Sequence, residues 1–435
     1  MNQRLSKLSL LALPIFVWAA CSADADSASG ANDAGRQDNR GGNNDSGSVD
    51  NEDDDGGDGI LDPDGGSSQP DGGGTVVPTA DGGTIQAGNT KGSCKSALPK
   101  EAQPLDTSKP TTVVGTGTSA SCTFAALKNA VQTAGIVTFN CGSTPVAIAV
   151  TETLKISTSK DTVIDGGGKI TLDGKSSVRI MSFDSPGWQT NDRRLTLQHI
   201  ALINGKTTPT EAIPTRPAPC SQGFNDGAGG GLYVRDGNVS IVDSVFANNQ
   251  GAPSGPDTGG GGIYIQGSKN GIVISKSTFQ NNKASNGAGL GCLFANMQVY
   301  DSLFSGNVAT GHDANGVDAK KCAFINNDQN ETGSGGNGGA LYSDGVSTAQ
   351  IPVNITVCGD AIENNAAGTN AFGGGIFFTS NNMGGTLSIA DSVLNGNTGG
   401  HWTVVSSGTV KNAGTAVGTN AKSITIANSS VQGVP

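Results

Sequence analysis

The sequence predicts an all-β protein built as a parallel β-helix, a solenoid in which successive coils stack as parallel strands. Two phrases that recur from residue 229 to the C-terminus carry this prediction. The first is Gly-Gly, Ile or Leu, then an aromatic residue, at 230–233, 261–264 and 374–377, with Ala for the second Gly at 339–342. The second reads Ser-x-Phe-x-x-Asn and closes on Asn249, Asn282 and Asn307. Self-similarity over tens of residues is typical of solenoids.

A short helix is expected before the repeats. Residues 122–131 have apolar side chains at helical spacing, with Thr123 or Ser121 as the N-cap and Gly135 as the stop. Residues 136–141 then alternate like a strand. Because the first coil of a solenoid has an exposed edge, we expect this helix to cap it. Cys122 and Cys141 flank the unit and are the expected disulfide.

Each coil should place the apolar residue of the second phrase in the interior, at positions 246, 279, 304, 324 and 394. The Asn three residues later can adopt a left-handed backbone, or pass an amide hydrogen bond to its copy in the next coil. Because the spacing between these positions is uneven, the excess residues must form loops. The long ones are 206–228, 250–258, 308–317, 328–338 and 366–372, and we expect them to wall a groove on one side.

Four regions follow from composition. Residues 1–21 form an export signal, with Arg4 and Lys7 before an apolar run. Residues 22–93 form an acidic tether rich in Gly, Asp, Ser and Asn, which should be disordered because it has too few apolar side chains to bury. Residues 94–150 form the N-terminal cap region, and residues 151–435 the β-helix.

Charge excludes several partners. The chain has a formal net charge of −11, yet residues 84–435 hold equal numbers of acidic and basic residues. The folded body is therefore neutral and has no basic stripe for nucleic acid. The absence of C-x-x-C, with only three His, argues against a zinc site. We expect no metal and no cofactor. No later apolar run is long enough to span a membrane.

The cysteine-flanked cap, the Asp-Gly-Gly-Gly turn at 165–168 and the two phrases together resemble exported right-handed parallel β-helix proteins. That group includes pectate-lyase-like folds and polymorphic outer-membrane-protein repeats. The resemblance covers about residues 120–435 and implies a right-handed coil. Separately, Cys21 after Ala19-Ala20 resembles a bacterial lipoprotein signal, although Trp18 stands where that family usually has an aliphatic residue. This implies lipidation of Cys21 and a place at the outer membrane, exposed at the cell surface. An ordinary secretory signal is the alternative.

Three sets of residues are candidates for function. Tyr233, Tyr264 and Tyr342 form a column that is either interior packing or an outward platform for sugar rings. A polar column three residues before the Phe position is either an ion ladder or a strip that binds sugar hydroxyls; it comprises His199, Asp243, Lys276, Asp301, Lys321, Gly359, Asp391 and Asn428. The weak catalytic candidates are His312, Asp313, Asp226 and Asp257.

These observations favour a surface-anchored extracellular protein that binds polysaccharide or a cell-surface glycan, or mediates adhesion, without an evident catalytic site. The alternative is a polysaccharide lyase or glycoside hydrolase of the pectate-lyase-like type, with groove loops that supply the acid and the base. Calcium-dependent lyase chemistry is disfavoured because Lys276 separates Asp243 from Asp301, so the carboxylates do not converge.

Overall fold

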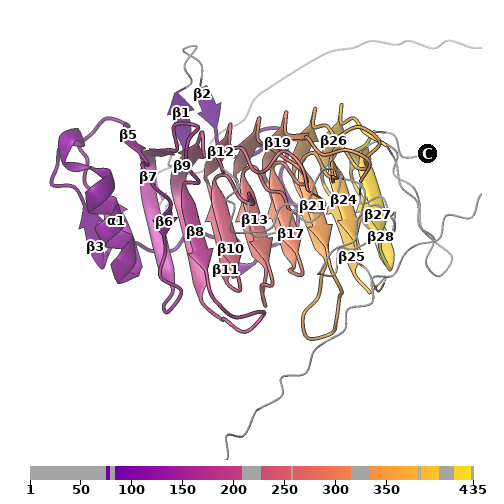
Figure 1. The fold of residues 1–435 in the computed structure, drawn as a ribbon, viewed down its shortest axis with the longest axis horizontal. Helices are drawn as coiled ribbons and strands as arrows, with labels where there is room; N and C mark the ends of the chain where they lie inside the picture. Colours follow the sequence, from indigo (N-terminus) through magenta and orange to yellow (C-terminus); the bar gives the residue numbers. More distant parts are fainter. Residues whose placement is uncertain are drawn as a thin grey trace, which may run out of the picture. The chain divides into compact units, whose positions relative to one another are not determined.

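The chain is an all-β solenoid whose strands stack in parallel (Figure 1). The computed structural model describes residues 75–78, 84–207, 227–255, 258–314, 334–380, 382, 384–400 and 416–432. Its one α-helix within these residues is α1 (Phe124–Thr133), and two 3-10 turns are η1 (Lys100–Ala102) and η2 (Ser119–Ser121). The prediction of a parallel β-solenoid is confirmed.

Every complete coil gives one strand to an eight-stranded parallel sheet. This first sheet contains β6 (Leu154–Lys155), β8 (Met181–Asp184), β10 (Leu232–Arg235), β13 (Ile263–Gln266), β17 (Leu290–Leu293), β21 (Leu341–Asp344), β24 (Ile376–Thr379) and β27 (Val417–Asn420).

The rest of each coil forms a second parallel sheet that bends once per coil. Strands that lie before the bend or run through it are β3 (Thr112–Val114), β4 (Gly135–Phe139), β7 (Thr162–Asp173), β9 (Arg194–Ile203), β11 (Asn238–Val242), β14 (Ile272–Ser275), β18 (Met297–Tyr300), β22 (Ile355–Cys358), β25 (Thr386–Ala390) and β28 (Ser423–Ala427). Strands after it are β5 (Val146–Ala149), β12 (Val245–Ala247), β15 (Thr278–Gln280), β19 (Leu303–Ser305), β23 (Ala361–Glu363), β26 (Val393–Asn395) and β29 (Ser430–Val431).

Left-handed residues make the bend. In successive coils the residue between the two strand segments has a positive φ, as at His199 (50°), Asp243 (43°), Lys276 (46°) and Asp301 (50°). Asp and His tolerate this backbone better than β-branched residues do. The residues of the polar column, three positions before each Phe, are therefore needed first for the left-handed backbone at the bend.

Two ladders run through the interior as predicted. The rings of Phe246, Phe279 and Phe304 are fully buried and stack with centroids 5.0 and 4.6 Å apart. Beside them, Asn249 Nδ2 donates to Asn282 Oδ1 at 3.1 Å, and the chain of amide bonds continues through Asn307, Asn365 and Asn397. The left-handed backbone lies one residue earlier than expected, for instance at Asn248 and Asn281, because the ladder Asn itself must align with its copy.

One expected coil falls on residues outside the described ranges. Phe324 with Asn327 was predicted as a coil, and both residues lie outside the described ranges. The neighbouring rungs pair directly instead: Phe304 is in register with Ile362, and Asn307 bonds to Asn365. The prediction for residue 324 therefore lies outside the described residues, and no described strand separates these two coils.

The helix α1 lies at the end of the stack where the chain enters it (Figure 1). Thr123 is its N-cap and accepts a hydrogen bond from Ala126 N at 3.2 Å, one of the two N-caps predicted. Leu127, Ala130 and Val131 are buried in the main core. The predicted disulfide Cys122–Cys141 is formed and ties the residue before the N-cap to the second residue after β4.

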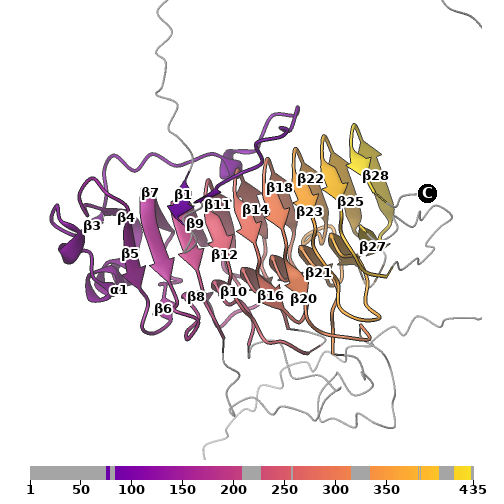
Figure 2. The same cartoon turned by 90° about the horizontal axis from the view of Figure 1, so that it is seen from above.

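The last part of the expected tether is structured. The strands β1 (Val76–Pro78) and β2 (Thr84–Gln86) pair antiparallel, and Val77 and Ile85 pack on Val245 of the second sheet. We call residues 84–110 the strap. Figure 2 shows this indigo segment running along the second sheet near β14 and returning toward β3. The expectation of disorder up to residue 93 is wrong here, because these apolar side chains have a surface to cover. The other two β-strands, β16 (Lys283–Ala284) and β20 (Val308–Ala309), pair after the Asn ladder.

Candidate functional site

The loops leave the coils at one corner. After the Asn ladder, Gln250 bridges both Lys206 and Lys283, and Ala366 bridges Val308 and Thr398 in the same way. Each loop therefore begins beside the loop of the next coil, as the uneven spacing predicts. We call the described part of this corner the loop face, defined by residues 250–255, 308–314, 334–338 and 366–372.

The loop face brings together the pair His312 and Asp313. The Nδ1 atom of His312 lies 2.7 Å from Oδ2 of Asp313, and Asn370 Nδ2 donates to Oδ1 of the same carboxylate at 2.9 Å. Both side chains are about half exposed. These hydrogen bonds, first that of Asn370 and then that of His312, lower the pKa of Asp313, so it is anionic at neutral pH.

This arrangement can orient a base. An imidazole whose Nδ1 is held by a carboxylate presents its other nitrogen to solvent, which is the geometry that a general base requires. The backbone supports the pair, because His312 N donates to Ser334 Oγ at 3.0 Å and His312 bridges Thr369 of the next coil. Asp226 and Asp257, the other two catalytic candidates, lie outside the described residues.

The tyrosine column does not form an exposed platform. Tyr233, Tyr264 and Tyr342 are in register on the outward side of the first sheet, but their exposures are only 3%, 0% and 1%. Gln266 Nε2 donates to Tyr233 Oη at 2.5 Å, and Arg179 lies over the Tyr233 ring at 4.9 Å. Burial raises the pKa of Tyr233 to about 12.

The prediction that these rings bind sugar from the surface is therefore wrong. The tyrosine side chains point away from the core side of their strands, but they are not exposed at the molecular surface, because glycine turns fold over this part of the sheet. Ala228 packs in one cluster with Tyr233 and Tyr264. A Cβ on Gly291 would meet the Tyr264 ring at 2.7 Å, which shows how closely the rings are enclosed.

The polar column at the bend receives the strap and also Thr75, the residue just before β1. Thr75 N donates to Asp243 Oδ1 at 2.8 Å, Cys94 N to Asp301 Oδ1 at 2.6 Å and Lys95 N to Asp391 Oδ2 at 3.0 Å. Within the described residues, no salt bridge joins one member of this column to another, although the Lys276 charge acts on Asp301 and the Asp243 charge acts on His199. Lys321 lies outside the described residues. The column instead holds a second segment of the chain by its backbone amides.

A second titratable pair lies where the strap returns. His199 Nδ1 is 3.0 Å from Asp165 Oδ1, while Thr107 Oγ1 and Gln198 Nε2 donate to Asp165 Oδ2 at 2.7 and 2.9 Å. Burial alone would raise the pKa of Asp165, but the hydrogen bonds outweigh it and lower the pKa to about 2. The bond to Asp165 raises the pKa of His199, against the opposing effect of burial.

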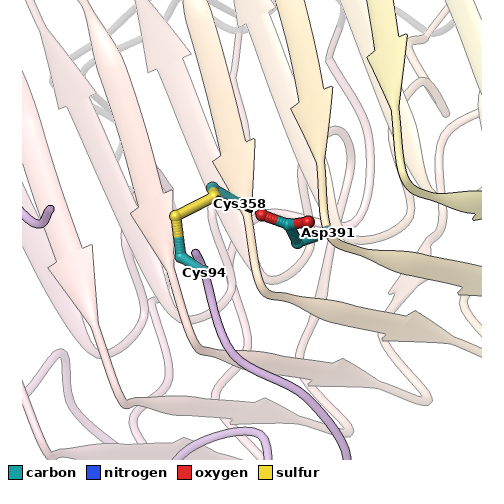
Figure 3. Close-up of side chains that lie close together, drawn as sticks. All are labelled: Cys94, Cys358 and Asp391. Atoms are coloured by element: carbon teal, nitrogen blue, oxygen red, sulfur yellow. Dashed lines mark hydrogen bonds between the residues drawn. A yellow bond between two sulfur atoms is a disulfide. The ribbon is translucent and has the colours of Figure 1, made fainter. Parts of the chain in front are cut away.

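A second disulfide, Cys94–Cys358, locks the strap to the solenoid across 264 residues of sequence. Figure 3 shows the Asp391 side chain beside it, directed toward Cys358. Oδ2 of Asp391 is 3.8 Å from Cys358 Sγ, and Oδ1 lies 3.4 Å from Lys95 Nζ. Sequence reasoning left this pairing open, since its only signal was the number of cysteines after Cys21. Among the described cysteines, only Cys292 is free, and it is buried.

Comparison of the chain with protein-family models, with curated proteins and with solved structures found no match. None of the helices in the described part of the chain has the length and apolarity needed to cross a bilayer.

Proposed function

We propose that this chain is an exported surface protein whose loop face binds polysaccharide or a cell-surface glycan, or mediates adhesion, without cleaving its ligand. The observation that carries the proposal is the shared corner at which the loops begin, because it gathers them on one rigid scaffold. The exposed cluster of His312, Asp313 and Asn370 adds donors and acceptors suited to sugar hydroxyls. The neutral body favours an uncharged or weakly charged partner over nucleic acid.

The finer features of the proposal follow the resemblance. The coils wind right-handed and α1 caps the first of them, as in pectate-lyase-like folds and polymorphic outer-membrane-protein repeats. Cys21 carries a lipid that anchors the chain at the outer membrane, and the acidic tether holds the solenoid away from that membrane. The two disulfides are compatible with an oxidising compartment. Labelling with a radioactive fatty acid tests the anchor: incorporation that persists in a Cys21→Ala variant refutes it.

The second candidate is a polysaccharide lyase or glycoside hydrolase. One observation favours it: the bonded His312 and Asp313 pair is exposed on the loop face, where a base would meet a substrate. Hydrolysis needs two carboxyl groups at a defined separation. On the described loop face Asp313 is the only acidic residue.

One experiment separates the two candidates. The exported protein is incubated with a panel of neutral and uronic polysaccharides, and both binding and new chain ends are measured. Saturable binding without new reducing ends or unsaturated products supports the binding protein. Cleavage that disappears in a His312→Ala variant would instead support the enzyme, with Lys269→Ala, remote from the loop face, as the matched control. Absence of both binding and cleavage across the panel would refute both.

A further inference from the structure

Three potential metal ligands meet at the strap. Cys94 lies on the strap, Cys358 ends β22, and Asp391 follows β25 in the next coil (Figure 3). They converge because Cys358 pairs in register with Ala390, which places residue 391 directly beside it. Two sulfur atoms and a carboxylate are a ligand set that Zn²⁺ accepts.

The spacing matches a tetrahedral zinc site. The two sulfurs and one carboxylate oxygen all lie within 4.8 Å of one another. In tetrahedral zinc geometry, with bonds of about 2.3 Å to sulfur and about 2.0 Å to oxygen, the sulfur and oxygen ligands are about 3.5 Å apart. The observed separation of Cys358 Sγ and Asp391 Oδ2 is 3.8 Å. Only the two sulfurs must move, from bonding distance to about 3.8 Å, which is a side-chain rotation.

The surroundings of the Asp391 carboxylate favour binding of a cation. The Asp391 side chain is only 6% exposed, and besides the strap its carboxylate is contacted by the side chain of Asn428. Its charged contact on the strap is the ammonium of Lys95, a side chain that is 75% exposed and free to swing away. Cys94 is half-buried, which leaves a path from solvent.

The strap has contacts that do not depend on the disulfide. Cys94 N donates to Asp301 Oδ1 at 2.6 Å and Asn89 Nδ2 to Gly359 O at 2.8 Å. Farther along, Ser275 Oγ donates to Ala102 O at 2.6 Å. Ala102 also packs with Tyr300 in a small apolar cluster. These contacts keep Cys94 near Cys358 after the sulfur–sulfur bond is broken.

We propose that Cys94, Cys358 and Asp391 form a zinc site when the disulfide is reduced. A thiol reductant gives two electrons and two protons to the sulfur–sulfur bond and itself becomes a disulfide. One Zn²⁺ then replaces the two thiol protons, which pass to solvent, and Asp391 supplies a carboxylate oxygen. A water completes the tetrahedron. The disulfide and the zinc ion are alternative cross-links between the strap and the solenoid, and the redox state of the two cysteines selects between them. This inference does not depend on glycan binding.

The test measures zinc on the exported protein in both redox states. A phosphine reductant is used because it opens disulfides without a competing thiol. Zinc content after gel filtration and the thiolate-to-metal charge-transfer band with Cd²⁺ are recorded for the wild type and for Cys94→Ser. The reduced wild type should hold one more equivalent of zinc than reduced Cys94→Ser, whereas the oxidised proteins should not differ. Equal zinc in the two reduced proteins would overturn the proposal.

The carboxylate has its own test. Asp391→Asn should bind zinc at least about tenfold more weakly in the reduced state, while the exposed Asp192→Asn should match the wild type. Full affinity in Asp391→Asn would remove that residue from the site. Proteolysis of the strap provides a readout that a folding defect does not mimic: zinc should restore its protection in the reduced wild type and not in Cys94→Ser. Cleavage unchanged by zinc in the wild type would also refute the proposal.

Discussion

Asp360 is a buried acid in a ladder of serines, and its replacement by Ser should stabilise the protein. Ser244, Ser277 and Ser302 precede it in register, and Ser392 follows. In those coils the serine hydroxyl donates to the carbonyl two residues earlier and accepts an amide from the preceding coil. Asp360 accepts from Ser302 N at 2.6 Å and from Cys358 N at 2.8 Å, and it is fully buried.

The magnitude follows from the balance of burial and hydrogen bonding. A buried ion loses several kcal/mol of hydration, and two amide bonds to the charge return about 1.5–3 kcal/mol each. A serine hydroxyl makes neutral bonds of about 1 kcal/mol without that loss. We therefore expect Asp360→Ser to raise the free energy of unfolding by about 1–3 kcal/mol at pH 7. The expected rise in Tm is about 2–5 °C for a body of this size.

The pH dependence identifies the cause. Burial, and then the nearby Asp301 charge, raise the pKa of Asp360 well above its ordinary value. A raised carboxyl pKa contributes stability that is present below the unfolded pKa of about 3.9 and is lost as pH rises through the folded pKa. The gain in Asp360→Ser should thus grow from about pH 4 upward and then level off. Asp360→Asn also removes the charge, but its side-chain NH2 group would point at the Cys358 amide, which is itself a donor. Its gain in unfolding free energy should therefore be smaller than that of Asp360→Ser.

The assay is calorimetric Tm between pH 3.5 and 8 for the wild type and both variants. A constant difference between the wild type and Asp360→Ser at every pH would show that packing, rather than charge, governs the site. A loss of stability in Asp360→Ser at pH 7 would refute the burial argument altogether.

Three further outcomes are expected. His199→Asn should flatten the fall in Tm above pH 6.5. The raised pKa of His199 stabilises the folded protein fully below the pKa of the unfolded chain, and this stability is lost as pH rises through the pKa of the folded protein. An unchanged Tm profile would show that the contact with Asp165 does not cause the fall. Asn307→Ala should lower the free energy of unfolding in urea by about 2–4 kcal/mol, because it leaves the neighbouring ladder amides unpaired. The control Asn395→Ala, at an exposed position, should cost under about 0.5 kcal/mol. Equal losses in the two variants would refute the ladder's role. Phe279→Ala should cost about 3–5 kcal/mol in the same assay through a cavity between two stacked rings, and a loss under 1 kcal/mol would show that the stack closes over it.

The repeated phrases predicted the solenoid interior because each coil meets the same neighbours. A stacked Phe or a ladder Asn contacts its own copy, so a local pattern repeated in the chain specifies its own environment. The helix after Thr123 was likewise predictable, since its cap and its buried stripe lie within ten residues. The Cys122–Cys141 disulfide joins residues close in sequence, and local reasoning found it.

Other features depended on segments that the repeats do not encode. Alternation predicted that Tyr264 points out of its strand, but only the fold shows glycine turns closing over it. Phe324 matches the coil phrase, yet Phe304 pairs with Ile362, since register is decided by the stack rather than by a single match. The candidate at His312 and Asp313 was visible as neighbours in sequence, whereas Asn370, which completes it, comes from another coil.

The sequence by itself determined the periodic part of this protein, because periodic contacts are short-range in the stack even when they are distant in the chain. The strap was decided by tertiary structure alone. Nothing near Cys94 indicates Cys358, which is 264 residues away, and nothing near Asp391 indicates the lysine that meets it. Such contacts depend on where a non-repeating segment finds apolar surface and free carboxylates, and only the assembled coils provide both.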